Sequence, residues 1–178
     1  MKQNIKLNEQ YLLSNHPEIK QSLNFKSIIQ SSVFLLIGCL LMASLPQIDD
    51  KSSAAYMAVM ISGVIIIIFG LLRFASSYKH LIYTHTGSPV LEKSFFFDST
   101  LIPRTKNALE AKDVESMKDI KWNTSGNARL DTFHSADKRF AAIRIYEYIP
   151  YTYEEASDIY IYNNEDAERL INILVIKK

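Results

Sequence analysis

The chain has 178 residues, of which 48% are hydrophobic and 22% are charged, and its 20 Lys and Arg residues nearly balance 19 Asp and Glu. Nucleic-acid-binding proteins usually carry a basic patch and a high isoelectric point, so we expect no nucleic-acid partner. One cysteine, five glycines and five prolines exclude a disulfide-stapled secreted scaffold, a collagen-like chain and a low-complexity linker.

Residues 1–26 form a polar, slightly basic arm in front of the apolar part of the chain. Residues 15–18 read Asn-His-Pro-Glu, with a proline at an early position and an acidic residue in the first turn, as is typical of a helix start. We predict that a helix begins there and continues through Ile19 and Leu23 into the next segment. The first 14 residues predict one short docked turn of helix.

Two uncharged windows follow, residues 27–48 and 52–72, separated by Asp49, Asp50 and Lys51. As α-helices they would be roughly 31 to 33 Å long, enough for a bilayer core of about 30 Å. The pattern predicts a transmembrane helical hairpin over residues 27–75, with spans at about 27–47 and 53–73. The alternatives are a cleaved signal peptide, which the long polar arm disfavours, and the masked apolar hairpin of a soluble toxin or storage protein.

Basic residues flank the hairpin unevenly. Lys20 and Lys26 precede the first window and Arg73 and Lys79 follow the second, whereas the connecting turn has only Lys51 beside two aspartates. The positive-inside rule therefore predicts a multi-pass protein of the bacterial inner membrane with both termini in the cytoplasm. The lipid bilayer is the first expected partner.

Small residues indicate how the two helices pack, because they let helix backbones approach closely in lipid. They would close the hairpin itself or join it to a second copy as a homo-oligomer. Neither window contains an Asp, Glu, Lys, Arg or His side chain, which disfavours a transporter or a proton relay. The candidate packing residues are Gly38, Ala43, Ala54, Ala58, Ser62 and Gly63.

Residues 80–178 predict a cytoplasmic α+β domain. Runs rich in β-forming residues alternate with turn residues, and an amphipathic helix closes the chain. The expected order is ββααβββα, a two-layer sandwich with a mostly antiparallel sheet. Strands are expected within 81–86, 90–97, 127–134, 139–149 and 157–163, and helices within 102–120 and after residue 164.

Tyrosine is concentrated near the end of this domain. Alternation along residues 139–149 separates an apolar face with Ile143 and Ile145 from a face with Arg144 and tyrosines, and residues 157–163 alternate in the same way. If the isoleucines pack against helices, the other sheet face is a partner-binding surface, since Tyr and Arg dominate interface hot spots. Alternatively, tyrosine serves only as a half-exposed strand former. The surface would comprise Arg144, Tyr146, Tyr148, Tyr151, Tyr153, Tyr160 and Tyr162.

Catalytic and metal-binding patterns are weak. Asp131, His134 and Asp137 are close enough in sequence to suggest a metal site, but in a strand that ends at a turn they should point in different directions. There is no HExxH motif, and a glycine-rich phosphate loop is absent because only Gly87 and Gly126 lie outside the hairpin. We therefore expect no enzyme, no metal and no cofactor.

The layout resembles small uncharacterised bacterial membrane proteins that join an N-terminal membrane hairpin to a cytoplasmic α+β domain. The segments that carry the resemblance are HLIYTHTGSPV at 80–90, FFFD at 95–98 and YIPYTYE at 148–154. The hairpin and the tyrosine-rich face together predict an integral inner-membrane protein whose cytoplasmic domain mediates protein–protein interaction. The alternatives are an immunity or accessory protein of a membrane-active toxin or secretion system, and a small-ligand-sensing or enzymatic domain.

Overall fold

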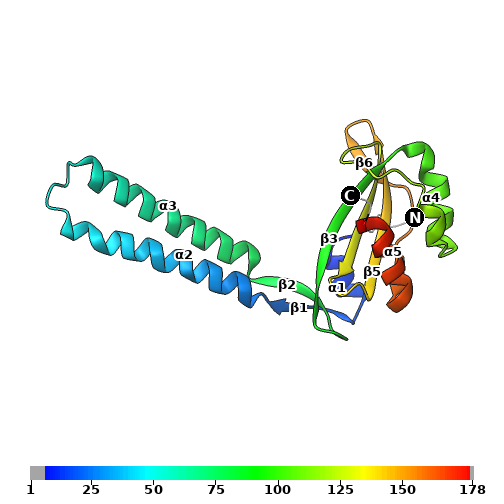
Figure 1. Ribbon diagram of the computed structural model, residues 1–178, viewed down its shortest axis with the longest axis horizontal. Coiled ribbons are helices and arrows are strands. Elements are labelled where there is room, and N and C mark those ends of the chain that lie inside the picture. Colours follow the sequence, from blue (N-terminus) through cyan, green and yellow to red (C-terminus); the bar gives the residue numbers. More distant parts are fainter. Residues whose placement is uncertain (1–6, 177–178) are drawn as a thin grey trace. The chain divides into compact units, whose positions relative to one another are not determined.

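The computed structural model describes residues 7–176, with side chains as far as residue 174 (Figure 1). It is an α+β structure of five α-helices, three short 3-10 helices and seven strands within this range. In chain order the elements are α1 (Glu9–Asn15), β1 (Ile19–Leu23), α2 (Phe25–Ser44), η1 (Leu45–Gln47), α3 (Ala54–Ser77), β2 (Lys79–Tyr83), β3 (Ser88–Phe97), η2 (Ser99–Leu101), α4 (Ile102–Glu110), η3 (Val114–Met117), β4 (Ala128–Ser135), β5 (Phe140–Ile149), β6 (Thr152–Glu155), β7 (Tyr160–Asn163) and α5 (Asn164–Ile176).

The chain divides into two compact units. Residues 21–80 form a helical unit, and the sheet unit combines residues up to 20 with residues from 81 onward. The segment before the hairpin, which the sequence predicts to be a separate arm, therefore shares a compact unit with the C-terminal part of the chain.

The helical unit is a pair of capped helices lying side by side (Figure 1). The Asn24 side chain accepts a hydrogen bond from the Ser27 amide at 3.1 Å, and the Ser53 hydroxyl accepts one from the Tyr56 amide at 3.2 Å. Such caps satisfy amides that the first helical turn leaves unpaired. By length and composition both helices could cross a membrane.

Three buried glycines set the close approach of α2 and α3. A Cβ atom on Gly38 would lie 2.6 Å from Ile67 Cγ1, and one on Gly63 would lie 3.0 Å from Met42 Sδ. Gly70 meets the opposite helix at 3.1 Å in the same way. Gly63 and Gly70 are seven positions apart, so they recur on one face of α3 at the spacing of two helical turns.

The sheet has the strand order β1-β2-β3-β4-β5-β6, and β7 also pairs with β5. The pairings of β2 with β3, β3 with β4, and β5 with β4, β6 and β7 are all antiparallel. An open antiparallel sheet agrees with the predicted fold class. Two of the strands, β1 and β6, are not predicted by the sequence pattern.

One face of the sheet carries the larger apolar core. Leu130 on β4 and Ile143 and Ile145 on β5 are fully buried there, against α4, η3 and α5. Residues two positions apart in a strand share a face, which explains why the predicted isoleucine face is the one the helices cover.

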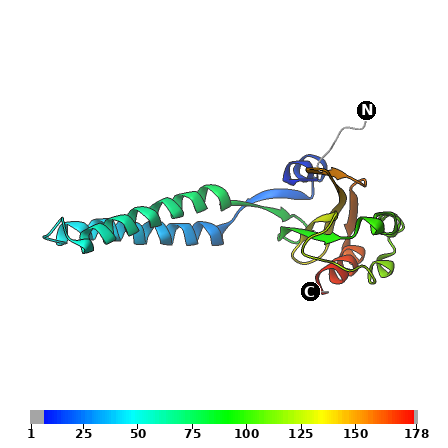
Figure 2. The same cartoon turned by 90° about the horizontal axis from the view of Figure 1, so that it is seen from above.

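The opposite face carries a second core beneath α1. Figure 2 shows α1, in dark blue, and α5, in red, on opposite sides of the sheet. The expected two-layer sandwich is therefore wrong, because α1 adds a third layer. The second core contains Leu7, Leu12, Ile19, Leu81, Tyr83, Phe133, Phe140 and Ala142.

The helix predicted to begin at residues 15–18 is also wrong. The helix present, α1, begins after Asn8, whose side chain accepts a hydrogen bond from the Tyr11 amide, and it ends at Asn15. His16 is extended, with φ −125° and ψ 93°, because the ring of Pro17 disfavours a helical conformation in the residue before it. The chain then continues as β1.

Candidate functional site

The β5–β6 hairpin is the part of the sheet unit where exposed aromatic residues gather. Ile149 pairs with Thr152 across a turn of two residues, Pro150 and Tyr151. Farther along the hairpin, Tyr148 lies opposite Tyr153, with ring centroids 5.2 Å apart. The sequence pattern predicts that the strand ends at Pro150 and that a connection follows, whereas the chain returns directly as β6.

The predicted single tyrosine face is wrong, because the short turn fixes a different register. Tyr146 lies opposite Glu155, so even-numbered residues of β5 share a face with odd-numbered residues of the returning chain. Tyr162 accordingly pairs with Ala141 and lies on the helix-covered face, whereas Tyr146 lies on the α1 face. The structure brings together Arg144, Tyr146, Tyr148 and Tyr153, and it separates Tyr160 and Tyr162 from them.

Tyr160 and Tyr162 connect β7 to α4. The Tyr162 hydroxyl donates to the Leu109 carbonyl at 2.6 Å, and the Tyr160 hydroxyl donates to a Glu110 carboxylate oxygen at 3.1 Å. Burial, and then the Glu110 carboxylate, raise the pKa of Tyr160 to about 12. Because Tyr162 satisfies a carbonyl in the last turn of α4, these two tyrosines have an evident structural role.

A cation–aromatic stack supports the base of the hairpin. The Arg129 guanidinium carbon lies 5.1 Å from the centroid of the Tyr146 ring and 4.6 Å from that of the Tyr153 ring. The Tyr153 hydroxyl also donates to the Gly126 carbonyl at 2.9 Å. These contacts hold β6 against the neighbouring loop and strand.

Two ion pairs flank this stack. Arg129 bonds Asp131 at 2.8 Å, and the Asp131 carboxylate also accepts from the Ser94 hydroxyl at 2.7 Å. Arg144 bonds Glu155 at 2.6 Å and donates through Nε to the Ser157 carbonyl at 3.0 Å. Asp131 and Arg144 are buried, so their charges need these partners.

The tip of the hairpin contrasts with this paired base. Tyr151 is 97% exposed and Tyr148 is 46% exposed. Tyr151 has φ +76°, a left-handed conformation that favours Gly or Asn and costs other residues roughly 1–2 kcal/mol. On the other side of the hairpin, exposed Glu147 lies opposite exposed Glu154, a like-charge pair that destabilises a sheet.

Asp131, His134 and Asp137 do not converge. Asp131 lies opposite Ser94 and Arg144, whereas His134 is three positions farther along β4 and therefore on the opposite face. Asp137 follows in an exposed turn. Among residues 7–176 no three His, Cys, Asp or Glu side chains are placed to hold a metal ion.

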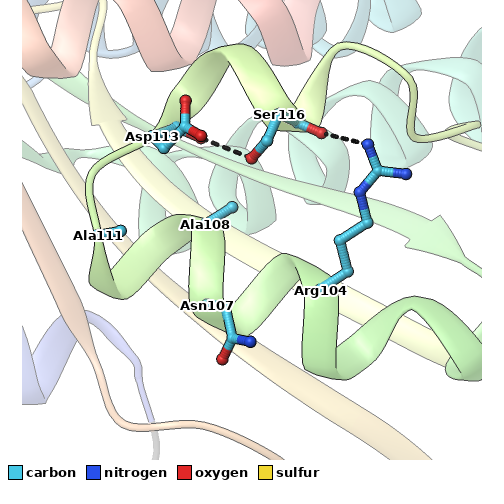
Figure 3. A pocket seen from close by; sticks show the side chains of 6 residues that line it. All are labelled: Arg104, Asn107, Ala108, Ala111, Asp113 and Ser116. Atoms are coloured by element: carbon cyan, nitrogen blue, oxygen red, sulfur yellow. Dashed lines mark hydrogen bonds between the residues drawn. The ribbon is translucent and has the colours of Figure 1, made fainter.

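An open depression lies between α4 and η3 (Figure 3). Arg104 donates to the Ser116 carbonyl at 3.1 Å, and the Ser116 hydroxyl donates to the Asp113 carbonyl at 2.9 Å. The bond from Arg104 connects α4 to η3 across the depression. Its lining residues are Arg104, Asn107, Ala108, Ala111, Asp113 and Ser116.

The predicted small-residue positions in the hairpin separate into two groups. Gly38 and Gly63 are buried between α2 and α3. The remaining four are exposed within the described chain, because the inward face of α3 is the one that carries Gly63 and Gly70. The exposed four are Ala43, Ala54, Ala58 and Ser62.

A family model described as a domain of unknown function (DUF8460) matches residues 21–81. No curated protein and no solved structure matches the chain. The matched range corresponds closely to the helical unit, residues 21–80, so the similarity concerns the hairpin and not the sheet unit. It is in keeping with a resemblance to uncharacterised proteins, although most of the segments that suggested the resemblance lie beyond residue 81.

Proposed function

We propose that this is an integral membrane protein, anchored by the α2–α3 hairpin, whose sheet unit binds another protein. The membrane anchor is supported by the apolar side chains that α2 and α3 expose on the outer surface of the hairpin. In the most apolar 18-residue windows of the two helices, only 17% and 11% of the residues are buried. Large side chains such as Leu36, Leu40 and Leu72 are exposed. Such a surface is unfavourable in water and favourable in hydrocarbon.

The segments that form the sheet unit support a topology in which the chain crosses the membrane twice. Because the sheet unit contains chain from both before and after the hairpin, the two flanks of the hairpin belong on the same side of a membrane. The basic residues Lys20, Lys26, Arg73 and Lys79 favour the cytoplasmic side. We place the sheet unit in the cytoplasm of a bacterium, at the inner membrane, with the α2–α3 turn outside.

Cysteine accessibility tests this topology, since Cys39 is the single cysteine. In a Cys39→Ala background, Ser52→Cys should react with a membrane-impermeant maleimide added to intact spheroplasts. Thr124→Cys, in a loop of the sheet unit, should react only after permeabilisation. Alkaline carbonate should leave the protein in the membrane pellet. Extraction of the protein by carbonate would contradict the proposal, and so would labelling of Thr124→Cys in intact spheroplasts.

The β5–β6 hairpin supports the protein-binding part. It presents Tyr148 and Tyr151 to solvent, while the stack of Arg129 with Tyr153 holds its base. Rigid, exposed tyrosines bind protein surfaces with little loss of conformational entropy. A photo-crosslinking amino acid at position 151 should capture a discrete protein in cells. The same group at exposed Glu168 on α5 is the matched control, and equal labelling from both positions would argue against a binding site.

A further inference from the structure

The exposed tip of the β5–β6 hairpin combines aromatic rings with unpaired carboxylates. Resting on the proposed protein-binding function, we infer that this tip docks a Lys- and Arg-rich segment of the partner protein. The tip is defined by Glu147, Tyr148, Pro150, Tyr151 and Glu154.

The aromatic part of the tip suits a cationic side chain. Tyr151 is almost wholly exposed, and the ring of Tyr148 is held at one edge by the ring of Tyr153, 5.2 Å away and tilted by 60°. Ring faces attract guanidinium and ammonium groups and accept the aliphatic stems of Arg and Lys. The same protein already uses this chemistry nearby, where Arg129 lies against Tyr153.

The negative charge of the tip favours a partner segment that carries positive charge. Glu147 and Glu154 face each other across the hairpin, and in the described chain neither has an ion pair or a side-chain hydrogen bond. Several other carboxylates of the sheet unit already have a basic neighbour, whereas Glu147 and Glu154 lie opposite each other. Those with a basic neighbour are Glu110, Glu115, Asp119, Asp131, Glu155, Glu165 and Asp166.

A cation between the two glutamates would relieve their repulsion, whereas an anionic partner would increase it. The same argument disfavours an anionic lipid surface as the occupant, because bilayer surface charge attracts basic segments and repels acidic ones. Tyr148 lies on one face of the hairpin and the two glutamates lie on the other, with Tyr151 in the turn between the strands. Among macromolecules, a basic protein segment that passes over this turn therefore suits both the rings and the carboxylates.

The conformation of Tyr151 allows stability and docking to be separated. Its φ of +76° suits glycine, so Tyr151→Gly relieves backbone strain while it removes the ring. Glu154→Lys likewise replaces a repulsive cross-strand pair with an attractive one while it reverses the charge of the tip. Both variants should unfold at the same temperature as the parent protein or higher.

The experiment uses the full-length protein in nanodiscs of neutral lipid and a short fluorescent peptide rich in Arg and Lys. A matched peptide has Glu at each basic position. By fluorescence anisotropy the parent should bind the basic peptide and not the acidic one, and added salt should weaken binding. Tyr151→Gly and Glu154→Lys should each weaken it by about fivefold or more. Glu168→Gln removes an exposed charge from α5 and should bind as the parent does.

Equal binding of the two peptides, or unchanged binding by both tip variants, would overturn the inference. The inference would also be overturned if the protein bound phosphatidylglycerol vesicles and not the basic peptide, and if the tip variants weakened that vesicle binding. The occupant would then be a lipid. Crosslinking from position 151 separates this inference from the proposed function. A protein adduct without binding of the basic peptide leaves the function standing and rejects the basic segment, and absence of any adduct rejects both.

Discussion

The hydroxyl of Tyr146 on β5 accepts a hydrogen bond from the backbone amide of Leu7, which is 3.2 Å away and 139 positions earlier in the chain. Leu7 and Leu12 lie in the second core together with Phe133 and Phe140. The segment that precedes the hairpin therefore completes the fold of a unit that is mostly built from the chain after it.

Leu12→Ala tests the contribution of this segment. Leu12 is fully buried in the second core, so its truncation should lower the free energy of unfolding by about 2–5 kcal/mol. Urea unfolding followed by the fluorescence of Trp122, the single tryptophan, measures the effect, because Trp122 packs against Phe95 and Phe97. Leu91→Ala, at an exposed site on β3, is the control and should change little. Equal effects would show that α1 does not stabilise the sheet.

Gly38→Leu should disrupt the hairpin. A side chain at this position meets Ile67 and the Gly63 carbonyl of the facing helix, and overpacking of this kind costs about 1–3 kcal/mol. Ala43→Leu places the same side chain on the exposed side of α2 and should be tolerated. Thermal unfolding in mild detergent, followed by circular dichroism, compares the two. Similar losses of stability would mean that the glycine contact does not set the helix spacing.

His134 should make the sheet unit sensitive to acid. Burial, and then the positive charges of Lys93 and Lys138, hold the pKa of His134 below its ordinary value of 6.5. The unfolded chain then binds the proton more readily than the folded one. The free energy of unfolding should therefore decrease as the pH falls below 6.5 and level off below the lowered pKa.

Urea titrations at a series of pH values measure this dependence. His134→Gln removes the titrating group and should flatten the acid side of the profile. Lys93→Gln removes a cation that lowers the pKa of His134, so it should reduce the loss of stability without abolishing it. An unchanged profile in His134→Gln would assign acid sensitivity to other groups.

Tyr160 should make the free energy of unfolding depend on pH in the alkaline range. Its pKa of about 12 lies above the ordinary value of 10.0, so the folded state holds the phenolic proton more tightly than the unfolded state. The stabilisation is complete below pH 10.0 and should be lost as the pH rises toward 12. Glu110→Gln removes a neighbouring negative charge and should shift the tyrosinate absorbance change to lower pH. Tyr160→Phe should remove that component, and its persistence would contradict the assignment.

Local patterns in the sequence predicted most of the secondary structure. The uncharged windows gave the two long helices within a few residues, because length and apolarity are properties of the segment alone. Alternation located most of β3, β4 and β5, since a strand with one face in a core repeats every two residues. The α1 helix was expected only as a short turn, and its layer was not expected, because nothing local shows which surface such a segment covers.

The tyrosine surface shows where sequence reasoning failed. Alternation assigns residues to faces within one strand, but the register between strands depends on the connection. The two-residue turn at Pro150 and Tyr151 shifted that register by one position relative to the expected face. As a result, Tyr162 entered the helix-covered core while Tyr148 and Tyr151 stayed exposed. A search for a tight turn with a proline in its first position would have found this hairpin.

The sequence by itself determined an apolar helical pair followed by an α+β unit, since the spacing of charges and the periodicity of strands are local patterns along the chain. Only the tertiary structure decided that residues before the hairpin belong to the sheet unit, and which tyrosines are buried. It also decided that Glu147 and Glu154 face each other without a basic partner in the described chain. These relationships join residues far apart in the chain or across a turn, and they follow from how the strands pair and the two cores close.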